Sequence, residues 1–282
     1  MRTGIEGALY NVYGEDRYKK MKEHGWDCCD FQGFVNTDTE LFEVSEEEFE
    51  VRLKAEKALA DEAGISFYQV HGPWRWPCQD ATEEDRQERF EKFSKAIRGA
   101  AILGSKHIVI HPIMPFGRKD TDPEYSFDLN VEFFKKLMPV AKKYGVTVDY
   151  ENMPMLRHSI ALPVALLRVI EAVDNENFRF CLDTGHCAVF NCSPADALRL
   201  MKRYVTTLHI HDNDGTKDQH RCPGNGVIDW EDFKKALHEI SFEGVVSFEN
   251  SFKIDPKPET PEAYEEKLKE FAVLARSFAE NN

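Results

Sequence analysis

The feature that most constrains the fold of this chain is a recurring unit, in which a polar helical stretch ends at a glycine and a short apolar strand follows at once. Glycine is favoured just past a helix because it adopts the left-handed backbone conformation without a Cβ clash. This alternation predicts an α/β protein. The glycines and strands are Gly25 before WDCCDF, Gly64 before ISFYQVHG, Gly104 before SKHIVIHP, Gly145 before VTVDYEN and Gly244 before VVSFEN.

Three further segments complete a set of eight predicted strands: GIEGALY opens the chain, and FRFCLDTG and TLHIHD follow polar connections. Capping boxes at 45–48 and 82–85 predict two helix starts, and further helices are predicted at 128–144, 163–173, 194–204, 230–240 and 261–280. Eight alternating units favour one domain, residues 1–282, folded as a closed (β/α)8 TIM barrel. A doubly wound sheet would usually carry a glycine-rich nucleotide loop after its first strand, and the sequence has none there.

Charge and apolar patterning narrow the classes of function. The chain has 36 Lys and Arg against 50 Asp and Glu, a net charge of −14, so we expect neither nucleic acid nor a membrane surface as a partner. No stretch approaches the roughly 18 apolar residues of a membrane span, and the first residues lack the apolar core of a signal peptide. Seven cysteines without framework-like spacing indicate reduced thiols, and we expect a cytoplasmic protein.

Six successive predicted strands end on a residue that can bind a metal ion. Because all strands of a (β/α)8 barrel are parallel, these side chains are expected to meet at the C-terminal rim, where the active sites of this fold lie. Each alone would more often be an ordinary hydrogen-bonded or capping side chain. Together, however, the acids would repel one another unless a cation offset their charge, so the sequence predicts a divalent metal site. The strand-end residues are His71, His111, Glu151, Asp183, His211 and Glu249.

A second layer is expected below the strand-end residues. Side chains alternate along a strand, so the residue two positions earlier also points into the barrel. Several of these positions are polar, which suits residues that orient the ligands above them. They are Gln69, Val109, Asp149, Cys181, His209 and Ser247.

Motifs along almost the whole chain resemble those of the xylose isomerase-like barrel superfamily. They are HGPW (71–74), HP (111–112), YEN (150–152), LDTGH (182–186), HIHDNDG…DQH…PGNGVIDW (209–230) and FEN (248–250). The members that the chain resembles are sugar and sugar-phosphate isomerases and epimerases, including ketose 3-epimerases. The resemblance implies that Glu151, Asp183, His211 and Glu249 bind one divalent cation, which would be Mn²⁺, Zn²⁺, Co²⁺ or Mg²⁺.

The same resemblance suggests which residues contact the substrate: His71, Trp74, His111, His186 and Lys217. His186 is similar to a residue that contacts a substrate oxygen, and Lys217 stands where the family usually has Arg. Trp74, with Trp76 and Phe116, would line the apolar side of a sugar pocket, although ordinary loop packing better explains each of these aromatic residues taken alone.

The ligand pattern also resembles that of endonuclease IV, whose site holds three zinc ions. This pattern implies up to three Zn²⁺ and adds His71, His111, His186, Asp218 and His220 to the ligands. Matched ligands do not by themselves imply DNA cleavage, because the same framework can surround a sugar pocket. The loops after the strands carry as many acids as bases, which disfavours binding to a DNA backbone.

The function expected from the sequence is a metal-dependent isomerase or epimerase of a sugar or sugar phosphate. The metal would act as a Lewis acid on the carbonyl, and Glu151 and Glu249 would be the base and acid that move a proton next to it through an enediolate. The alternatives are a multi-zinc phosphodiesterase and a lyase or deglycosylase that acts on an oxidised sugar. The sequence leaves the oligomeric state open, a homo-oligomer included.

Overall fold

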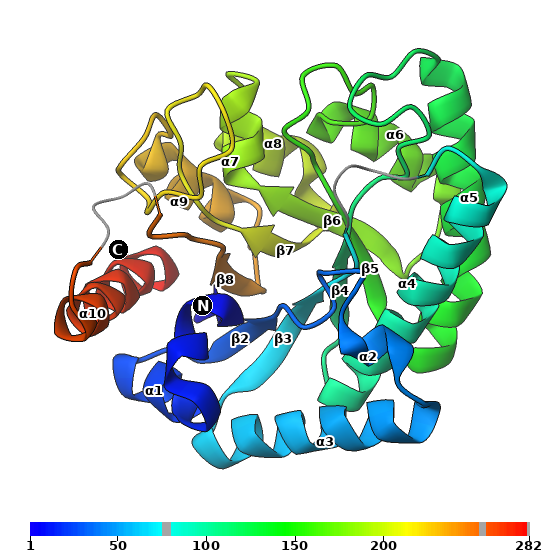
Figure 1. Ribbon diagram of the computed structural model, residues 1–282. Coiled ribbons are helices and arrows are strands. Elements are labelled where there is room, and N and C mark those ends of the chain that lie inside the picture. Colours follow the sequence, from blue (N-terminus) through cyan, green and yellow to red (C-terminus); the bar gives the residue numbers. More distant parts are fainter. Residues whose placement is uncertain (75–79, 254–257, 281–282) are drawn as a thin grey trace.

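The structure, a computed structural model, describes residues 1–74, 80–253 and 258–280. Eight strands form one parallel sheet in the order β7-β6-β5-β4-β3-β2-β1-β8, and the predicted α/β barrel is confirmed. In Figure 1 the helices surround the strands, which converge at the centre of the view. The strands are β1 (Arg2–Glu6), β2 (Cys28–Phe31), β3 (Ser66–His71), β4 (His107–Ile110), β5 (Thr147–Glu151), β6 (Phe178–Asp183), β7 (Val205–His209) and β8 (Val245–Phe248).

The barrel closes between β7 and β8 by a single bridge. The Ile210 amide donates to the Ser247 carbonyl at 2.9 Å, and the Glu249 amide donates to the Ile210 carbonyl at 3.2 Å. On the other side of β8, a regular parallel ladder joins it to β1. The bridge holds the segments that carry His211 and Glu249 side by side at the upper, C-terminal end of the barrel.

Ten α-helices and two 3₁₀ segments lie within the described ranges, and none of these helices is both long and apolar enough to cross a membrane. The helices are α1 (Arg17–His24), α2 (Glu40–Glu43), α3 (Glu46–Ala63), α4 (Glu83–Leu103), α5 (Pro123–Tyr144), α6 (Pro163–Val173), α7 (Thr184–Val189), α8 (Pro194–Met201), α9 (Trp230–Glu239) and α10 (Pro261–Ala279). The 3₁₀ segments are η1 (Gly7–Asp16) and η2 (Lys202–Tyr204).

The predicted helices match closely, with two differences at their ends. The helix expected from residue 128 begins at Pro123, because the Asp122 side chain caps it by accepting from the Tyr125 amide. The helix expected over 194–204 ends at Met201 and continues as 3₁₀ segment η2. Thr82 and Asp85 form a complete capping box, whereas at Ser45 only the serine half is present. There the Glu48 carboxylate instead accepts from Arg52 at 2.7 Å.

Four of the five glycines in the recurring unit end helices in the left-handed conformation, with φ between 62° and 101°. Gly244 does not, because α9 ends five residues earlier at Glu239 and the left-handed residue there is Ser241, with φ of 54°. Gly244 is required for a different reason. A Cβ at this position would lie 2.4 Å from Cζ of Phe242 and 2.9 Å from the Thr206 carbonyl oxygen.

Strand alternation explains why the acids point into the barrel. Tyr150 of β5 points outward, where its ring packs against Phe134 of α5 at 4.8 Å and its hydroxyl donates to Asn130 at 2.9 Å. Because neighbouring side chains on a strand face opposite sides, Asp149 and Glu151 are directed inward. Apolar packing of α5 on the outside of the sheet therefore fixes the carboxylates on the inside.

Candidate metal centre

The predicted strand-end residues all lie at the upper end of the barrel. His71, Glu151 and Asp183 are the last residues of β3, β5 and β6. His111 and Glu249 follow β4 and β8 by one residue, and His211 follows β7 by two, a small shift from the predicted strand ends. All are buried except Glu249, whose side chain retains 13% exposure.

Glu151 lies at the centre of a group of histidines. Its Oε2 is 2.7 Å from Nε2 of His111 and 3.8 Å from Nε2 of His71, and its Oε1 is 2.7 Å from Nδ1 of His209. Burial acts to raise the pKa of Glu151, but His209 and His111 together hold it well below its usual range. Burial lowers the pKa of His111 to about 4, so this imidazole is neutral near pH 7, the form that binds metal ions.

Asp183, at the end of the neighbouring strand β6, anchors a second group. Its Oδ2 is 2.9 Å from Nε2 of His211, and its Oδ1 accepts from the His186 amide at 2.6 Å, which caps α7. The Asn152 side chain binds both the amide and the carbonyl of Asp183 at 2.9 Å, which fixes the end of β6. Gly185 makes room for His211, because a Cβ there would lie 2.0 Å from Cε1 of that imidazole.

Asp218 and His220 extend the second group from the loop after β7. Asp218 Oδ2 is 3.3 Å from Nε2 of His186 and 3.1 Å from Nε2 of His220, and its Oδ1 is buried without a hydrogen-bond partner. The His220 ring stacks on His211 at 4.2 Å, and its backbone is left-handed with φ of 49°. Burial lowers the pKa of His186, but Asp183 and Asp218 more than offset this effect and raise it to about 10.

His209 connects the barrel interior to the rim. Its Nε2 contacts Asp30 of β2 at 2.9 Å, and its Nδ1 lies 2.7 Å from Glu151 Oε1 and 3.3 Å from Glu249 Oε2. Gln69 also donates to Asp30 at 2.9 Å. His209 therefore lies below the rim and contacts both glutamates, in the position that strand alternation suggested.

Asp149 does not contact the ligands above it, although such contacts are expected for the residues two positions before the strand ends. It pairs with His107 at the start of β4, at 2.9 Å, and accepts from Thr206 at the start of β7. The hydrogen bonds of Asp149 therefore lie at the lower end of the barrel, because its carboxylate is one layer too deep to reach the rim.

Every residue named as a metal ligand from the sequence lies in a cluster whose ligand atoms are within 4.8 Å of one another. These clusters include His71–His111–Glu151, His71–His209–Glu249, Asp183–His186–His211 and His211–Asp218–His220. They bring together imidazole nitrogens and carboxylate oxygens, donors that suit Mn²⁺, Zn²⁺ and similar divalent ions.

Comparison with known proteins gives the family. The model of the xylose isomerase-like TIM barrel family matches residues 18–272. The chain belongs to this family. It is 29% identical over 193 residues to the protein MJ1311 of Methanocaldococcus jannaschii, a match that covers 65% of this chain and 65% of that protein.

Solved structures show the same fold as this xylose isomerase-like barrel. D-psicose 3-epimerase from Clostridium cellulolyticum H10, solved with D-tagatose, superposes with a TM-score of 0.82 at 18% identity and full coverage of both chains. The IolI protein with a binding zinc atom superposes with a TM-score of 0.74 at 18% identity, over 99% of this chain and 96% of that one. At these identities the likeness shows the fold alone.

Two acids of the barrel mouth were missed from the sequence. Glu6 is the last residue of β1, and Asp30 lies one residue before the end of β2. Both lie at or next to the end of a strand, the same sequence signal that marks the other rim residues. Glu6 lines a cavity of about 550 Å³ at the rim, together with Asp218 and His220. Burial and the nearby Glu249 raise the pKa of Glu6 to about 8.

The aromatic residues predicted for a sugar pocket differ in their surroundings. The Trp74 ring packs edge-on against His111 at 4.5 Å and against a small apolar cluster that contains Met114 and Met153. Phe116 is 40% exposed and packs on Tyr125 of α5 at 5.8 Å, away from the histidines. Trp76 lies outside the described residues.

Lys217 is exposed beside the inward-facing Asp218, and its ammonium makes no hydrogen bond or ion pair with the described part of the chain. Lys217 belongs to the loop after β7, which also carries Asp218 and His220. Its predicted contact with substrate therefore stays a prediction.

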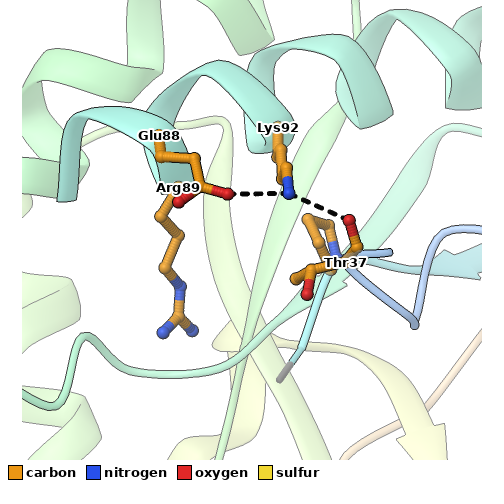
Figure 2. Close-up of a pocket in the computed structure, with 5 residues that line it drawn as sticks. Thr37, Glu88, Arg89 and Lys92 are labelled. Carbon is orange, nitrogen blue, oxygen red and sulfur yellow. Dashed lines mark hydrogen bonds and ion pairs between the residues drawn. The ribbon is translucent and has the colours of Figure 1, made fainter. Parts of the chain in front are cut away.

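A buried ion pair supports the loop that follows His111. Arg89 of α4 lies 2.6 Å from Asp80, and Asp80 accepts from the Met114 amide at 2.7 Å. Figure 2 shows Arg89 pointing away from its neighbours Glu88 and Lys92, while Lys92 contacts Glu88 and donates to the Thr37 carbonyl at 2.9 Å. The pocket beside these side chains measures about 10 Å³, too small for a sugar ring.

Proposed function

We propose that this protein is a divalent-cation-dependent isomerase or epimerase that acts on a sugar or sugar phosphate. The observation that carries the proposal is the placement of two glutamates at the barrel mouth: Glu151 Oε1 and Glu249 Oε2 both approach Nδ1 of His209, at 2.7 and 3.3 Å. The names of similar proteins, such as D-psicose 3-epimerase and inosose isomerase, support the same class of reaction.

The residues at the rim fit a cation. Four carboxylates, Glu151, Asp183, Asp218 and Glu249, belong to the groups of ligand atoms at the barrel mouth, and Glu151 and Asp183 are buried, which is costly for such charges unless positive charge offsets them. We propose that Glu151, Asp183, His211 and Glu249 bind one divalent ion. When bound, this ion would supply Lewis-acid stabilisation of negative charge on the substrate carbonyl oxygen.

The two glutamates would move the proton. Glu151 is held in its ionised form by His209 and His111, which suits a base that abstracts a proton next to the carbonyl. Glu249 comes from β8, several strands away around the barrel, and would return a proton from the other face of the enediolate. Proton transfer on two faces gives epimerisation, whereas a single shuttling carboxylate gives isomerisation.

The histidine clusters favour one second candidate, a multi-zinc phosphodiesterase. Three groups of ligand atoms would each offer donors to an ion: His71–His111–Glu151, Asp183–His186–His211 and His211–Asp218–His220. This enzyme would cut abasic duplex DNA, with affinity that falls steeply as salt rises.

One experiment separates these functions. The purified protein is analysed for bound metals and is then screened, with Mn²⁺ added, for exchange of solvent deuterium into ketoses, ketose phosphates and keto-glycosides. We expect about one bound ion and deuterium next to a carbonyl in one substrate class. Product fragments in place of an exchanged sugar would indicate the lyase alternative. Undiminished turnover after chelation would refute the metal-dependent mechanism, and DNA incision without sugar exchange would establish the phosphodiesterase.

A further inference from the structure

A cavity at the upper rim contains polar groups that the proposed mechanism does not use. The cavity of about 550 Å³ lies among the segments that follow β1, β7 and β8. Its wall includes Glu6, His220, Asn250 and Lys253. His220 Nδ1 contacts the backbone carbonyl of Glu249 at 3.0 Å, so the cavity adjoins a proposed cation ligand. A substrate bound at the cation would therefore extend into this space.

Two wall residues provide hydrogen-bond acceptors that have no donor among the described residues. The Glu6 carboxylate makes no hydrogen bond or ion pair within the described ranges, although it is partly exposed to the cavity. Asn250 is fully buried, and its Nδ2 donates to the Arg221 carbonyl at 2.6 Å, which fixes the orientation of the amide. Its Oδ1 is left buried without a partner. A buried acceptor without a donor is unfavourable, so a ligand that supplies the donor is favoured.

We propose, on the basis of the proposed function, that Glu6 and Asn250 bind hydroxyl groups of the substrate, and that the part of the substrate in this cavity is uncharged. Hydroxyl groups donate the hydrogen bonds that these oxygens lack, whereas a phosphate or carboxylate would bring further acceptors and negative charge. This inference narrows the substrate to a neutral polyhydroxylated sugar and excludes a sugar phosphate whose phosphate enters the cavity.

The acids and bases in the cavity wall are balanced in number, Glu6 and Asp218 against His220 and Lys253, so the wall has no excess of positive charge for an anion. His220 is already paired with Asp218 at 3.1 Å, and Lys253 is exposed at the edge of the described chain. Glu249 and burial raise the pKa of Glu6 to about 8. A carboxyl group can hydrogen-bond a hydroxyl in either protonation state, but in neither state does it carry the positive charge that would offset an anion.

The test measures binding without turnover. Xylitol has the hydroxyl groups of a sugar but no carbonyl, so it cannot react, and xylitol 5-phosphate adds only the phosphate. Both are titrated by calorimetry into the Mn²⁺-loaded protein. The proteins compared are wild type, Glu6→Gln, Glu6→Leu and a control, Glu243→Gln, which changes an exposed acid at the lower end of the barrel. The metal content of each variant is measured in parallel.

We expect wild type to bind xylitol more tightly than xylitol 5-phosphate. Glu6→Leu should weaken xylitol binding by about tenfold, the effect of losing one hydrogen bond to a desolvated acceptor. Glu6→Gln should weaken it less and should reduce the preference over the phosphate. Glu243→Gln should match wild type.

Four results would overturn the inference. They are an unchanged xylitol affinity in Glu6→Leu, no binding of xylitol to wild type, tighter binding of xylitol 5-phosphate than of xylitol, and loss of Mn²⁺ from the Glu6 variants. The proposed function fails by a different result, namely the absence of deuterium exchange by the wild-type protein with any sugar. The two failures are therefore distinguishable.

Discussion

The same two neighbouring strands carry a histidine–carboxylate pair at each end of the barrel. At the lower end, His107 of β4 lies 2.9 Å from Asp149 of β5, and at the upper end His111 lies 2.7 Å from Glu151. Burial lowers the pKa of both histidines. At His107 the charge and hydrogen bond of Asp149 more than offset burial, so its pKa is raised, whereas that of His111 falls to about 4.

The difference lies in what surrounds each pair. Asp149 has His107 and a hydrogen bond from Thr206, and the Tyr68 ring stacks on His107 at 4.9 Å. This pair is balanced in charge and needs no ligand. Glu151 is instead shared between His111 and His209, and Nδ1 of His111 is buried without a partner. The lower pair stabilises the fold, whereas the upper group retains donors that a cation and a substrate would use.

The largest expected effect is on kcat/KM and distinguishes the two inward-facing carboxylates of β5, Glu151 and Asp149. Glu151→Gln and Glu249→Gln should each lower kcat/KM by about 10²–10⁴-fold, and together abolish turnover, because each removes a proton-transfer group and a cation donor. Asp149→Asn should leave kcat/KM near the wild-type value. Incorporation of solvent deuterium into the substrate measures all of them. Wild-type turnover in Glu151→Gln would show that the upper pair does not carry the chemistry.

A second comparison uses one glycine at each end of the barrel. Gly185→Ala should displace His211, since the new Cβ would lie 2.0 Å from its Cε1, and should weaken Mn²⁺ binding by about 10–100-fold. Gly244→Ala meets Phe242 and the Thr206 carbonyl and should lower the free energy of unfolding by about 1–3 kcal/mol while the Mn²⁺ affinity is unchanged. Calorimetry and urea unfolding give the two quantities. Equal loss of Mn²⁺ affinity in both variants would mean that Gly185 acts only through stability.

The sequence predicts the upper rim well because one rule covers it. Parallel strands end on one side, so residues such as Glu151 and Asp183 can be grouped without knowledge of any contact. Glu6, the last residue of β1, obeys the same rule. That Glu6 lines a cavity could not be predicted, because segments from distant parts of the chain form the cavity together.

Partners inside the barrel are harder to predict. Strand alternation predicts that Asp149 points inward, but it does not predict the partners of its carboxylate. Two residues along a strand span about 6–7 Å, so Asp149 lies too far below Glu151 to share its partners. His107 begins a strand instead of ending one, so the rule gives it no role. Gly244 is a second case in which the reason for a residue lies in contacts that the sequence does not show. Its position before a strand predicted a helix end, whereas close contact with Phe242 and Thr206 explains why the residue is glycine.

The smallest expected effect is a pH dependence of stability that distinguishes the two histidines. His107 has a raised pKa, so the folded state binds its proton more tightly than the unfolded state does. Its contribution is complete below the unfolded value of about 6.5 and is lost as pH rises through the folded pKa. For His111 the pH dependence has the opposite sign. Because its folded-state pKa is about 4, its contribution to the free energy of unfolding is lost as pH falls from about 6.5 toward 4. Urea unfolding in EDTA would compare wild type with His107→Gln above pH 6.5 and with His111→Gln below it. The wild-type advantage over His107→Gln should shrink as pH rises, and an advantage that grew instead would show that Asp149 does not hold the proton on His107.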